Sequence, residues 1–272
     1  MEEITITPNK DLGRVGRDLW RYRELFFFLA WRNLLIRYKQ TVLGIAWSLL
    51  RPLLTMIIFT VVFGQFAGLP AFNVPYPVLV LAALIPWQFF SNVFTESSES
   101  LLAESTLISK VYFPRIVIPT TCIVVSLTDL VISLALFSVL MVVYKIPLSP
   151  TMALLPIFIL MIALLSLGVG YFFSTLNLKY RDFRYVVPFI IQIGLYLSPV
   201  GFSSRIVPEH LQLIYALNPM VGIVEGFRWA LLGERYGFEL NSFLISLGMT
   251  IGIFLVGFNY FIHNERKFAD IL

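Results

Sequence analysis

Six long apolar stretches constrain this sequence more than any other feature. Each contains 19 or more residues with few charges, and they cover residues 45–67, 77–100, 116–143, 152–176, 185–203 and 241–262. An α-helix needs about 20 apolar residues to cross the hydrocarbon core of a membrane. Only 13% of all residues are charged, against about 25% in soluble domains. The sequence therefore predicts an all-α membrane protein with six transmembrane helices.

The lysine and arginine residues predict the orientation of these spans. With residue 1 placed in the cytoplasm, sixteen of the twenty fall on the inner side, and the four outside are Lys145, Arg205, Arg228 and Arg235. Because cytoplasmic segments carry the excess of basic residues, we expect both termini in the cytoplasm and the chain in the inner membrane of a bacterium. Basic residues beside apolar stretches fit a membrane, so no nucleic-acid partner is expected.

Between the fifth and sixth stretches, residues 204–239 predict a re-entrant or interfacial helical pair on the outer face. Asn218 suits an N-cap with Pro219 at the first helical position, and Gly233 suits a helix stop. The helix 219–232 would be about 21 Å long at 1.5 Å per residue, too short to cross. An ordinary surface loop is the alternative. The residues that stand out on this outer helix, on one face, are Glu225 and Arg228.

The N-terminal part, residues 1–44, is predicted to be cytoplasmic and to include an amphipathic helix over 17–39, followed by a membrane domain over 45–272. At 100° per residue, one arc of this helix is charged and the opposite arc is apolar, with Trp20 and Trp31 as interfacial anchors. A plain membrane anchor without further role is the alternative. The charged arc contains Arg17, Arg21, Glu24, Arg32 and Lys39, and the apolar arc contains Phe26, Ala30 and Leu34.

The sequence lacks the motifs of a self-powered or catalytic protein. There is no G-x-x-x-x-G-K-[ST] phosphate loop, no G-x-S-x-G and no H-E-x-x-H. One cysteine and two separated histidines make no metal site. We therefore expect no catalytic residue, metal or cofactor in this chain. Asp129, deep in the third stretch, is either a substrate or proton site or a structural residue bonded to Ser126, Ser133 or a neighbouring helix; the lack of further intramembrane acids favours the structural role.

Four aromatic residues near the outer ends of the spans have two interpretations. They belong either to an aromatic belt that faces lipid headgroups or to the lining of an exit channel, where flat rings would stack on sugar rings. The residues are Trp87, Phe90, Tyr196 and Phe202.

The two short inner loops, 102–115 and 177–184, are candidates for contact with a soluble motor protein, and simple connectors are the alternative. The first places Leu107 and Ile108 beside Glu104 and Lys110, which suits a small polar-and-apolar interface. The second is short, charged and aromatic.

Four motifs together resemble the membrane subunits of ABC-2 polysaccharide exporters, which move O-antigen, capsule or teichoic acid. The resemblance covers nearly the whole chain. The motifs are Leu29-Ala30-Trp31-Arg32-Asn33 continuing through Arg37-Tyr38-Lys39-Gln40, Leu43-Gly44-Ile45-Ala46-Trp47 and Arg51-Pro52; Lys110-Val111-Tyr112-Phe113-Pro114-Arg115 with Pro119; Tyr180-Arg181-Asp182; and Asn218-Pro219-Met220 before Trp229.

The resemblance implies a homodimer with a channel at its interface, in contact with membrane lipid. Each chain would pair with a separate ATPase subunit, two copies in all, which would bind the ATP and magnesium and drive an undecaprenyl-linked polysaccharide across the membrane. A drug or small-lipid exporter of the same class, a lipid-linked sugar transferase and a proton-coupled carrier are the alternatives. The residues expected to couple to the ATPase are Arg21, Arg32, Glu104, Leu107, Ile108, Lys110, Arg115, Tyr180, Arg181 and Asp182.

Overall fold

The computed structural model describes residues 16–17, 20–39, 46–180 and 182–268, and in these ranges every regular element is helical. Helix α3 (Ala46–Phe59) continues directly into a π-helical segment at Thr60–Phe66, and the non-helical residues 67–75 lead from there to α4 (Tyr76–Ala103). The helices are α2 (Arg23–Lys39), α3 (Ala46–Phe59), α4 (Tyr76–Ala103), α5 (Ser105–Lys110), α6 (Val117–Val143), α7 (Leu155–Lys179), α8 (Phe183–Leu197), α9 (Glu209–Tyr215), α10 (Pro219–Leu232) and α11 (Leu240–Asn264).

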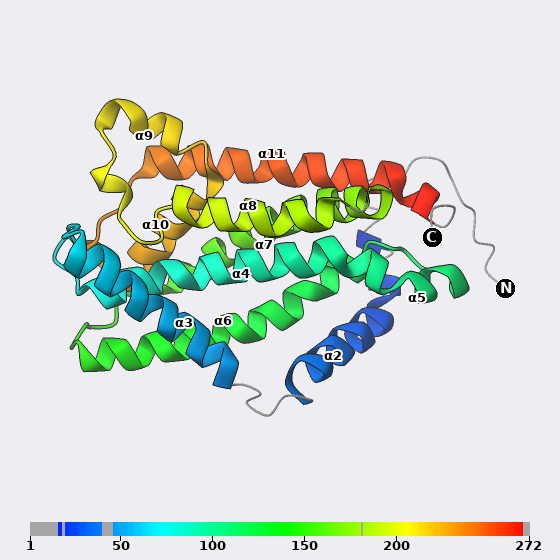
Figure 1. Cartoon of the computed structure of the whole chain (residues 1–272), viewed down its shortest axis with the longest axis horizontal. Helices are drawn as coiled ribbons and strands as arrows, with labels where there is room; N and C mark the ends of the chain where they lie inside the picture. The colour runs from blue at the N-terminus through cyan, green and yellow to red at the C-terminus, as the bar shows by residue number, and fades with distance from the viewer. Residues whose placement is uncertain (1–15, 18–19, 40–45, 181, 269–272) are drawn as a thin grey trace.

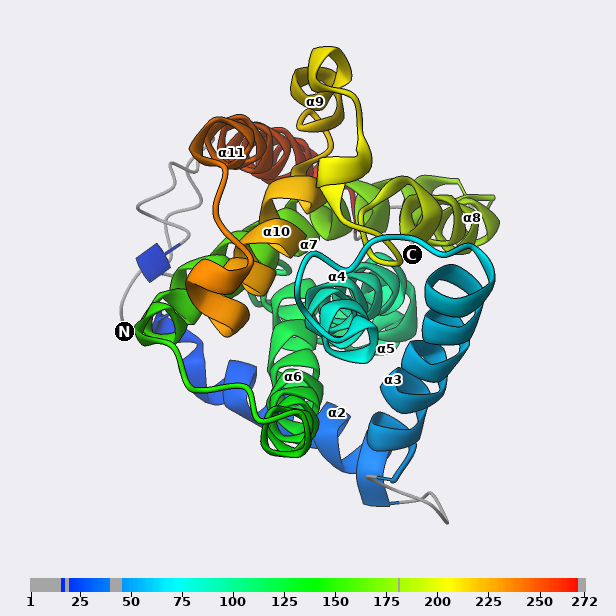
Figure 2. The ribbon, with the colours of Figure 1, turned by 90° about the vertical axis from the view of Figure 1, so that its left-hand side faces the viewer.

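Helix α4 occupies the centre of the molecule. Viewed from one end, α3, α6, α7, α8 and α10 surround it (Figure 2). Its apolar segment is 83% buried, whereas that of α3 is 11% buried and that of α11 is 17% buried. The long helices run side by side, with α9 and α10 at one end and α5 at the other (Figure 1). The bundle therefore has one fully enclosed span and a wall of spans with large exposed apolar surfaces.

Five of the six predicted spans are present as helices long and apolar enough to cross a membrane. They are Ala46–Phe66, Tyr76–Ala103, Val117–Val143, Pro150–Lys179 and Leu240–Asn264. The fifth predicted span, 185–203, is shorter than expected, because α8 ends at Leu197. Ser198 precedes Pro199 and adopts an extended backbone, as steric clash with the proline ring requires. Residues 198–203 form a turn instead of a last helical turn.

The two helices expected between the fifth and sixth spans are α9 and α10. Helix α10 begins and ends where its capping residues predict. The Asn218 side chain accepts a hydrogen bond from the Met220 amide, at 3.0 Å. Gly233 ends the helix with a φ of +67°, a conformation that favours glycine. The prediction of a helix over 219–232 is confirmed.

Helix α2 packs against α6 through Leu29 and Ala30, both nearly inaccessible. The predicted division into one charged and one apolar arc is wrong in part. Arg32, expected on the solvent side, turns inward to Glu104, and Phe27 and Phe28 are exposed. The reason is that the Glu104 carboxylate, at the end of α4, offers Arg32 a partner, and this contact outweighs the periodicity of the helix alone.

Two glycines bring α7 and α11 into backbone contact. A Cβ atom on Gly257 would overlap the carbonyl oxygen of Gly168, and one on Gly168 would overlap the backbone of Phe254. Gly248 and Gly252 lie four residues apart on the same helix α11, and each has open space where a Cβ atom would be. The close crossing therefore depends on a pair that is distant in sequence.

We predict that Gly257→Ala destabilises the chain by about 2 kcal/mol or more, because the backbones of α7 and α11 must separate. Gly252→Ala on the same helix is the matched control, and it should be neutral or stabilise by up to about 1 kcal/mol through helix propensity. Thermal unfolding of the purified chain in detergent measures both. Equal melting temperatures for the two variants would contradict the assigned contact.

Candidate functional site

A polar network joins α2, α3, α4 and α6. Arg37 of α2 forms ion pairs with Glu96 of α4 and Asp129 of α6. Asp129 also accepts hydrogen bonds from the Tyr38 hydroxyl at 2.6 Å and the Ser48 hydroxyl at 2.7 Å. Four segments that are distant in sequence thus meet at one carboxylate.

The protonation of Tyr38 supports this network at neutral pH. Burial, and next the neighbouring Asp129, raises the pKa of Tyr38 to about 12. Its hydroxyl therefore keeps its proton and donates a hydrogen bond to the Asp129 carboxylate. The sequence-based preference for a structural Asp129 agrees with these contacts, although its partners are neither Ser126 nor Ser133 but residues of α2, α3 and α4.

A second ion pair holds α2 against the bundle, about one and a half helical turns before Arg37 in the sequence. Arg32 binds the carboxylate of Glu104, at the end of α4. Beside it, the Asn33 amide lies 3.5 Å from the Thr121 hydroxyl of α6. Because charges in a membrane-embedded region require partners, these pairs hold α2 against the bundle more specifically than its apolar contacts do.

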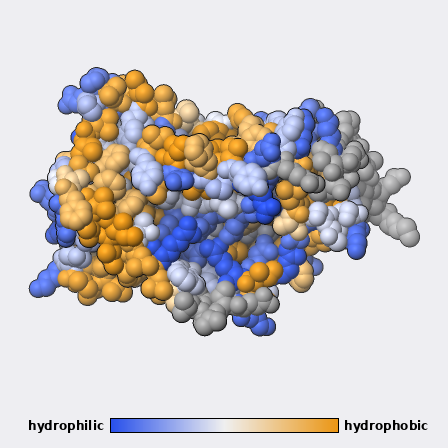
Figure 3. Space-filling view, in the orientation of Figure 1, coloured by the Kyte–Doolittle hydropathy of each residue, from blue (hydrophilic) through white to orange (hydrophobic). Residues whose placement is uncertain are grey.

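A cleft opens in front of the network. Its main cavity has a volume of about 650 Å³ and lies among α2, α3, α4, α6 and α8, and a neighbouring cavity of about 180 Å³ reaches Asp129. Figure 3 shows a hydrophilic area in the middle of this face, beside the apolar surface over α3 and α8. A polar cleft that opens sideways from the bundle can receive a polar group attached to a lipid.

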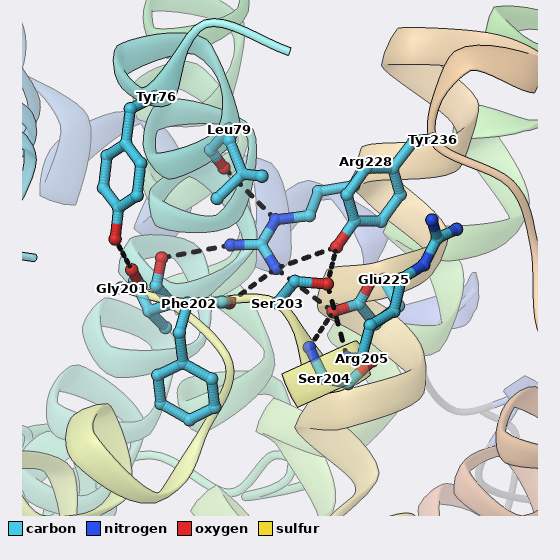
Figure 4. Close-up of polar contacts among 11 residues, drawn as sticks. Tyr76, Leu79, Gly201, Phe202, Ser203, Ser204, Arg205, Glu225, Arg228 and Tyr236 are labelled. Atoms are coloured by element: carbon cyan, nitrogen blue, oxygen red, sulfur yellow. Dashed lines mark hydrogen bonds and ion pairs between the residues drawn. The ribbon is translucent and has the colours of Figure 1, made fainter. Parts of the chain in front are cut away.

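The end of the bundle that carries α9 and α10 contains a different cluster, built around Arg228 of α10. The side chain is completely buried. Its Nε donates to the carbonyl of Leu79 at 3.2 Å, and its Nη atoms donate to the carbonyls of Phe202 at 2.8 Å and Val200 at 3.1 Å (Figure 4). Glu225 pairs with the same guanidinium at 3.1 Å.

Glu225 extends this cluster to the turn after α8. Its carboxylate accepts a hydrogen bond from the Ser204 amide at 2.9 Å. Tyr236 faces the guanidinium and shares a hydrogen bond with Ser203 at 2.6 Å. Burial raises the pKa of Tyr236, so its hydroxyl remains protonated. The prediction that Glu225 and Arg228 share one face is confirmed, and together they hold the 198–204 turn against α4.

The predicted coupling residues that the structure describes fall into three groups. Glu104 and Arg32 bind one another, and the Arg115 amide and side chain bind Glu265 after α11. Ile108 is only 5% exposed and Leu107 packs against the core, so neither offers a free apolar surface. The exposed members are Arg21, Lys110, Tyr180 and Asp182, and Arg181 lies outside the described residues.

The four aromatic candidates do not form one surface. Trp87 is 4% exposed and Phe90 is 8% exposed, because both lie on the enclosed α4. Because Trp87 and Phe90 are buried within this single chain, they face neither lipid headgroups nor a channel there. Tyr196 is 61% exposed, and Phe202 stacks on Tyr215. Only Tyr196 therefore remains a free aromatic surface of this set.

Sequence reasoning missed Arg37 as the centre of the inner network. The signal that could have identified it was the presence of two acids, Glu96 and Asp129, in separate spans, which require a basic partner. Among the described residues, no three His, Cys, Asp or Glu side chains lie close enough to hold a metal ion.

Comparison with known proteins gives matches over most of the chain. A family model described as ABC-2 type transporter matches residues 24–232. An O-antigen export system permease protein from Myxococcus xanthus is 30% identical over 264 residues, covering 94% of this chain and 98% of the relative. One from Klebsiella pneumoniae is 28% identical, covering 92% and 95%. A polysialic acid transport protein from Escherichia coli is 25% identical, covering 81% and 85%.

We predict that Arg228→Met destabilises the fold by about 3 kcal/mol, because it leaves three carbonyls and Glu225 without their buried donor. Arg235→Met is the control, since Arg235 is an exposed arginine at the same end, and its effect should stay within about 0.5 kcal/mol. Chemical or thermal unfolding in detergent measures the difference. Similar losses in both variants would mean that the buried cluster is not what holds this end together.

Proposed function

The chain belongs to the ABC-2 type transporter family, and on this basis we propose that it is the membrane-spanning permease subunit of an ATP-driven exporter of lipid-linked polysaccharide. It is a multi-pass membrane protein, with five long apolar helices and the shorter α8. The observation that carries the proposal is that relatives named for O-antigen export align with nearly the whole chain. The side-opening polar cleft supports the same substrate class.

In this proposal α8 is the fifth of six spans, with the 198–204 turn completing the crossing. Helices α9 and α10 form a re-entrant pair at the outer membrane face, held by Arg228. The N-terminal helix α2 lies at the inner face, and both termini are cytoplasmic. The basic residues concentrated in the segments on that side support this orientation, and the division into residues 1–44 and 45–272 follows from it.

The energy would come from a separate ATPase subunit, because the sequence contains no phosphate loop. Two copies of that subunit would bind ATP and magnesium and act on a homodimer of this chain. The undecaprenyl-linked polymer would pass through the dimer. Such a division of labour explains why no residue of this chain needs a catalytic role.

The surface for the ATPase would be the inner end that carries α5. Val111 and Tyr112, which follow α5, are exposed apolar residues beside the exposed Lys110. Tyr180 and Asp182 add a second exposed loop. An aromatic anchor with charged neighbours is a common composition of interface hot spots, so Tyr112 replaces Leu107 and Ile108 as the expected docking residue.

We predict that deletion of this chain abolishes surface polysaccharide and causes lipid-linked polymer to accumulate inside the cell. Purified alone, the chain should show no ATP hydrolysis, and the complex with its ATPase should hydrolyse ATP in membranes. Polymer extraction from inner and outer fractions, with an ATPase assay, measures both. Normal surface polymer in the deletion strain would contradict the proposed function.

We predict that Tyr112→Ala weakens association with the ATPase about tenfold, which corresponds to about 1.4 kcal/mol, because it removes an aromatic anchor. Tyr196→Ala is the matched control, since Tyr112 and Tyr196 are 60% and 61% exposed at opposite ends. Co-purification of the two subunits measures the effect. If Tyr112→Ala retains the ATPase as well as the control does, the inner surface after α5 is not the docking site.

A further inference from the structure

One arginine at the polar cleft has no partner among the residues that the structure describes. Arg51 of α3 lines both the 650 Å³ cavity and the 180 Å³ cavity, as do Arg37 and Asn92. It is exposed, and within the described part of the chain its guanidinium makes no ion pair or hydrogen bond. The segment that directly precedes α3 in the sequence, residues 40–45, contains no carboxylate.

The other charges at or beside the cleft are three arginines and four carboxylates, all of them in ion pairs. The three carboxylates that line the main cavity are Glu96, Glu99 and Glu104. Arg37 pairs with Glu96 and Asp129, Arg32 pairs with Glu104, and Arg184 lies 3.7 Å from Glu99. Arg51 is the arginine at the cleft that makes no ion pair among the described residues, so its guanidinium is available to an anionic ligand.

The surface of α3 beyond Arg51 is apolar. Leu54 and Ile58 follow at three and seven residues, on the same side of the helix, and are 49% and 58% exposed. Trp47, one turn before Arg51, is also exposed and lines the smaller cavity. Along one helix face, the chain thus presents an aromatic ring, a free guanidinium and then an apolar track.

This order matches an amphiphile with an anionic head. A guanidinium binds phosphate oxygens with two parallel hydrogen bonds, and an apolar track suits a hydrocarbon chain. A free phosphate ion would use only the first feature. The cleft also opens on a face bordered by α3 and α8, with Ile191 of α8 in its lining (Figure 3), where lipid rather than bulk water is the expected surrounding.

We propose that Arg51 binds the phosphate-bearing head group of a lipid whose chain lies along Leu54 and Ile58. The proposal rests on the function proposed above, since it places the lipid-linked end of the exported polymer at this cleft. The paired charges of Arg32 and Arg37 would position α2 beside the head group without competing for it. Arg51 would thus distinguish a lipid phosphate from an uncharged lipid.

The test uses the full chain with its ATPase in nanodiscs of neutral phosphatidylcholine, with farnesyl pyrophosphate as the probe. Arg51→Gln should weaken binding at least tenfold, and Arg51→Lys, which keeps the charge but loses the planar fork, should weaken it less. Arg235→Gln, which removes one positive charge at the far end, should leave affinity unchanged. Inorganic pyrophosphate and farnesol should each bind more weakly than the joined molecule.

Three results would overturn the proposal. The first is equal affinity of the unchanged chain and Arg51→Gln for farnesyl pyrophosphate. The second is tight binding of inorganic pyrophosphate, which would assign the site to a soluble anion. The third is a loss of farnesol binding in Arg51→Gln as large as the loss of farnesyl pyrophosphate binding, which would show that the substitution alters the cleft rather than recognition of the phosphate. Surface polymer made by the unchanged complex is measured alongside. If export continues, a negative binding result overturns the role of Arg51 and leaves the proposed export function standing.

Discussion

The arrangement of the inner half depends on one buried carboxylate. Asp129 lies within a span, where an unpaired charge would be costly, and it is satisfied by Arg37 and Tyr38 of α2, Ser48 of α3 and Asn92 of α4. Because these partners come from three other helices, the contact determines where α2 lies and how α3 approaches α4. The cleft exists because this polar network replaces close apolar packing between those helices.

At the end of the bundle that carries α9 and α10, the buried charge is positive and also requires partners. Arg228 is buried, and it is satisfied mainly by backbone carbonyls of α4 and of the turn after α8. Since Pro199 ends α8 early, the carbonyls of that turn have no helical partners, and Arg228 supplies the missing donors. An ion-pair network at one end and a carbonyl-binding arginine at the other therefore hold the ends of the central α4 to neighbours that are distant in sequence.

The proposed function uses two residues that these clusters leave accessible. Among the described residues they leave Arg51 at the cleft without an ion pair and Tyr112 exposed after α5. In the function proposed above, Arg51 would receive an anionic lipid and Tyr112 a soluble partner. The exposed apolar faces of α3 and α8 lie beside the cleft.

The sequence by itself determined the local elements. Apolar length located five spans within a few residues, and Asn218 and Gly233 located α10, because helix length and capping depend on neighbouring residues. Only the tertiary structure decided which side chains pair with one another. The periodicity of α2 placed Arg32 in solvent, and position near a span end placed Trp87 on a surface; both are wrong because burial depends on helices far away in sequence. Arg37, Asp129 and Arg51 differ in role for the same reason: a charge is structural when folding brings it an opposite charge, and available to a ligand when folding does not.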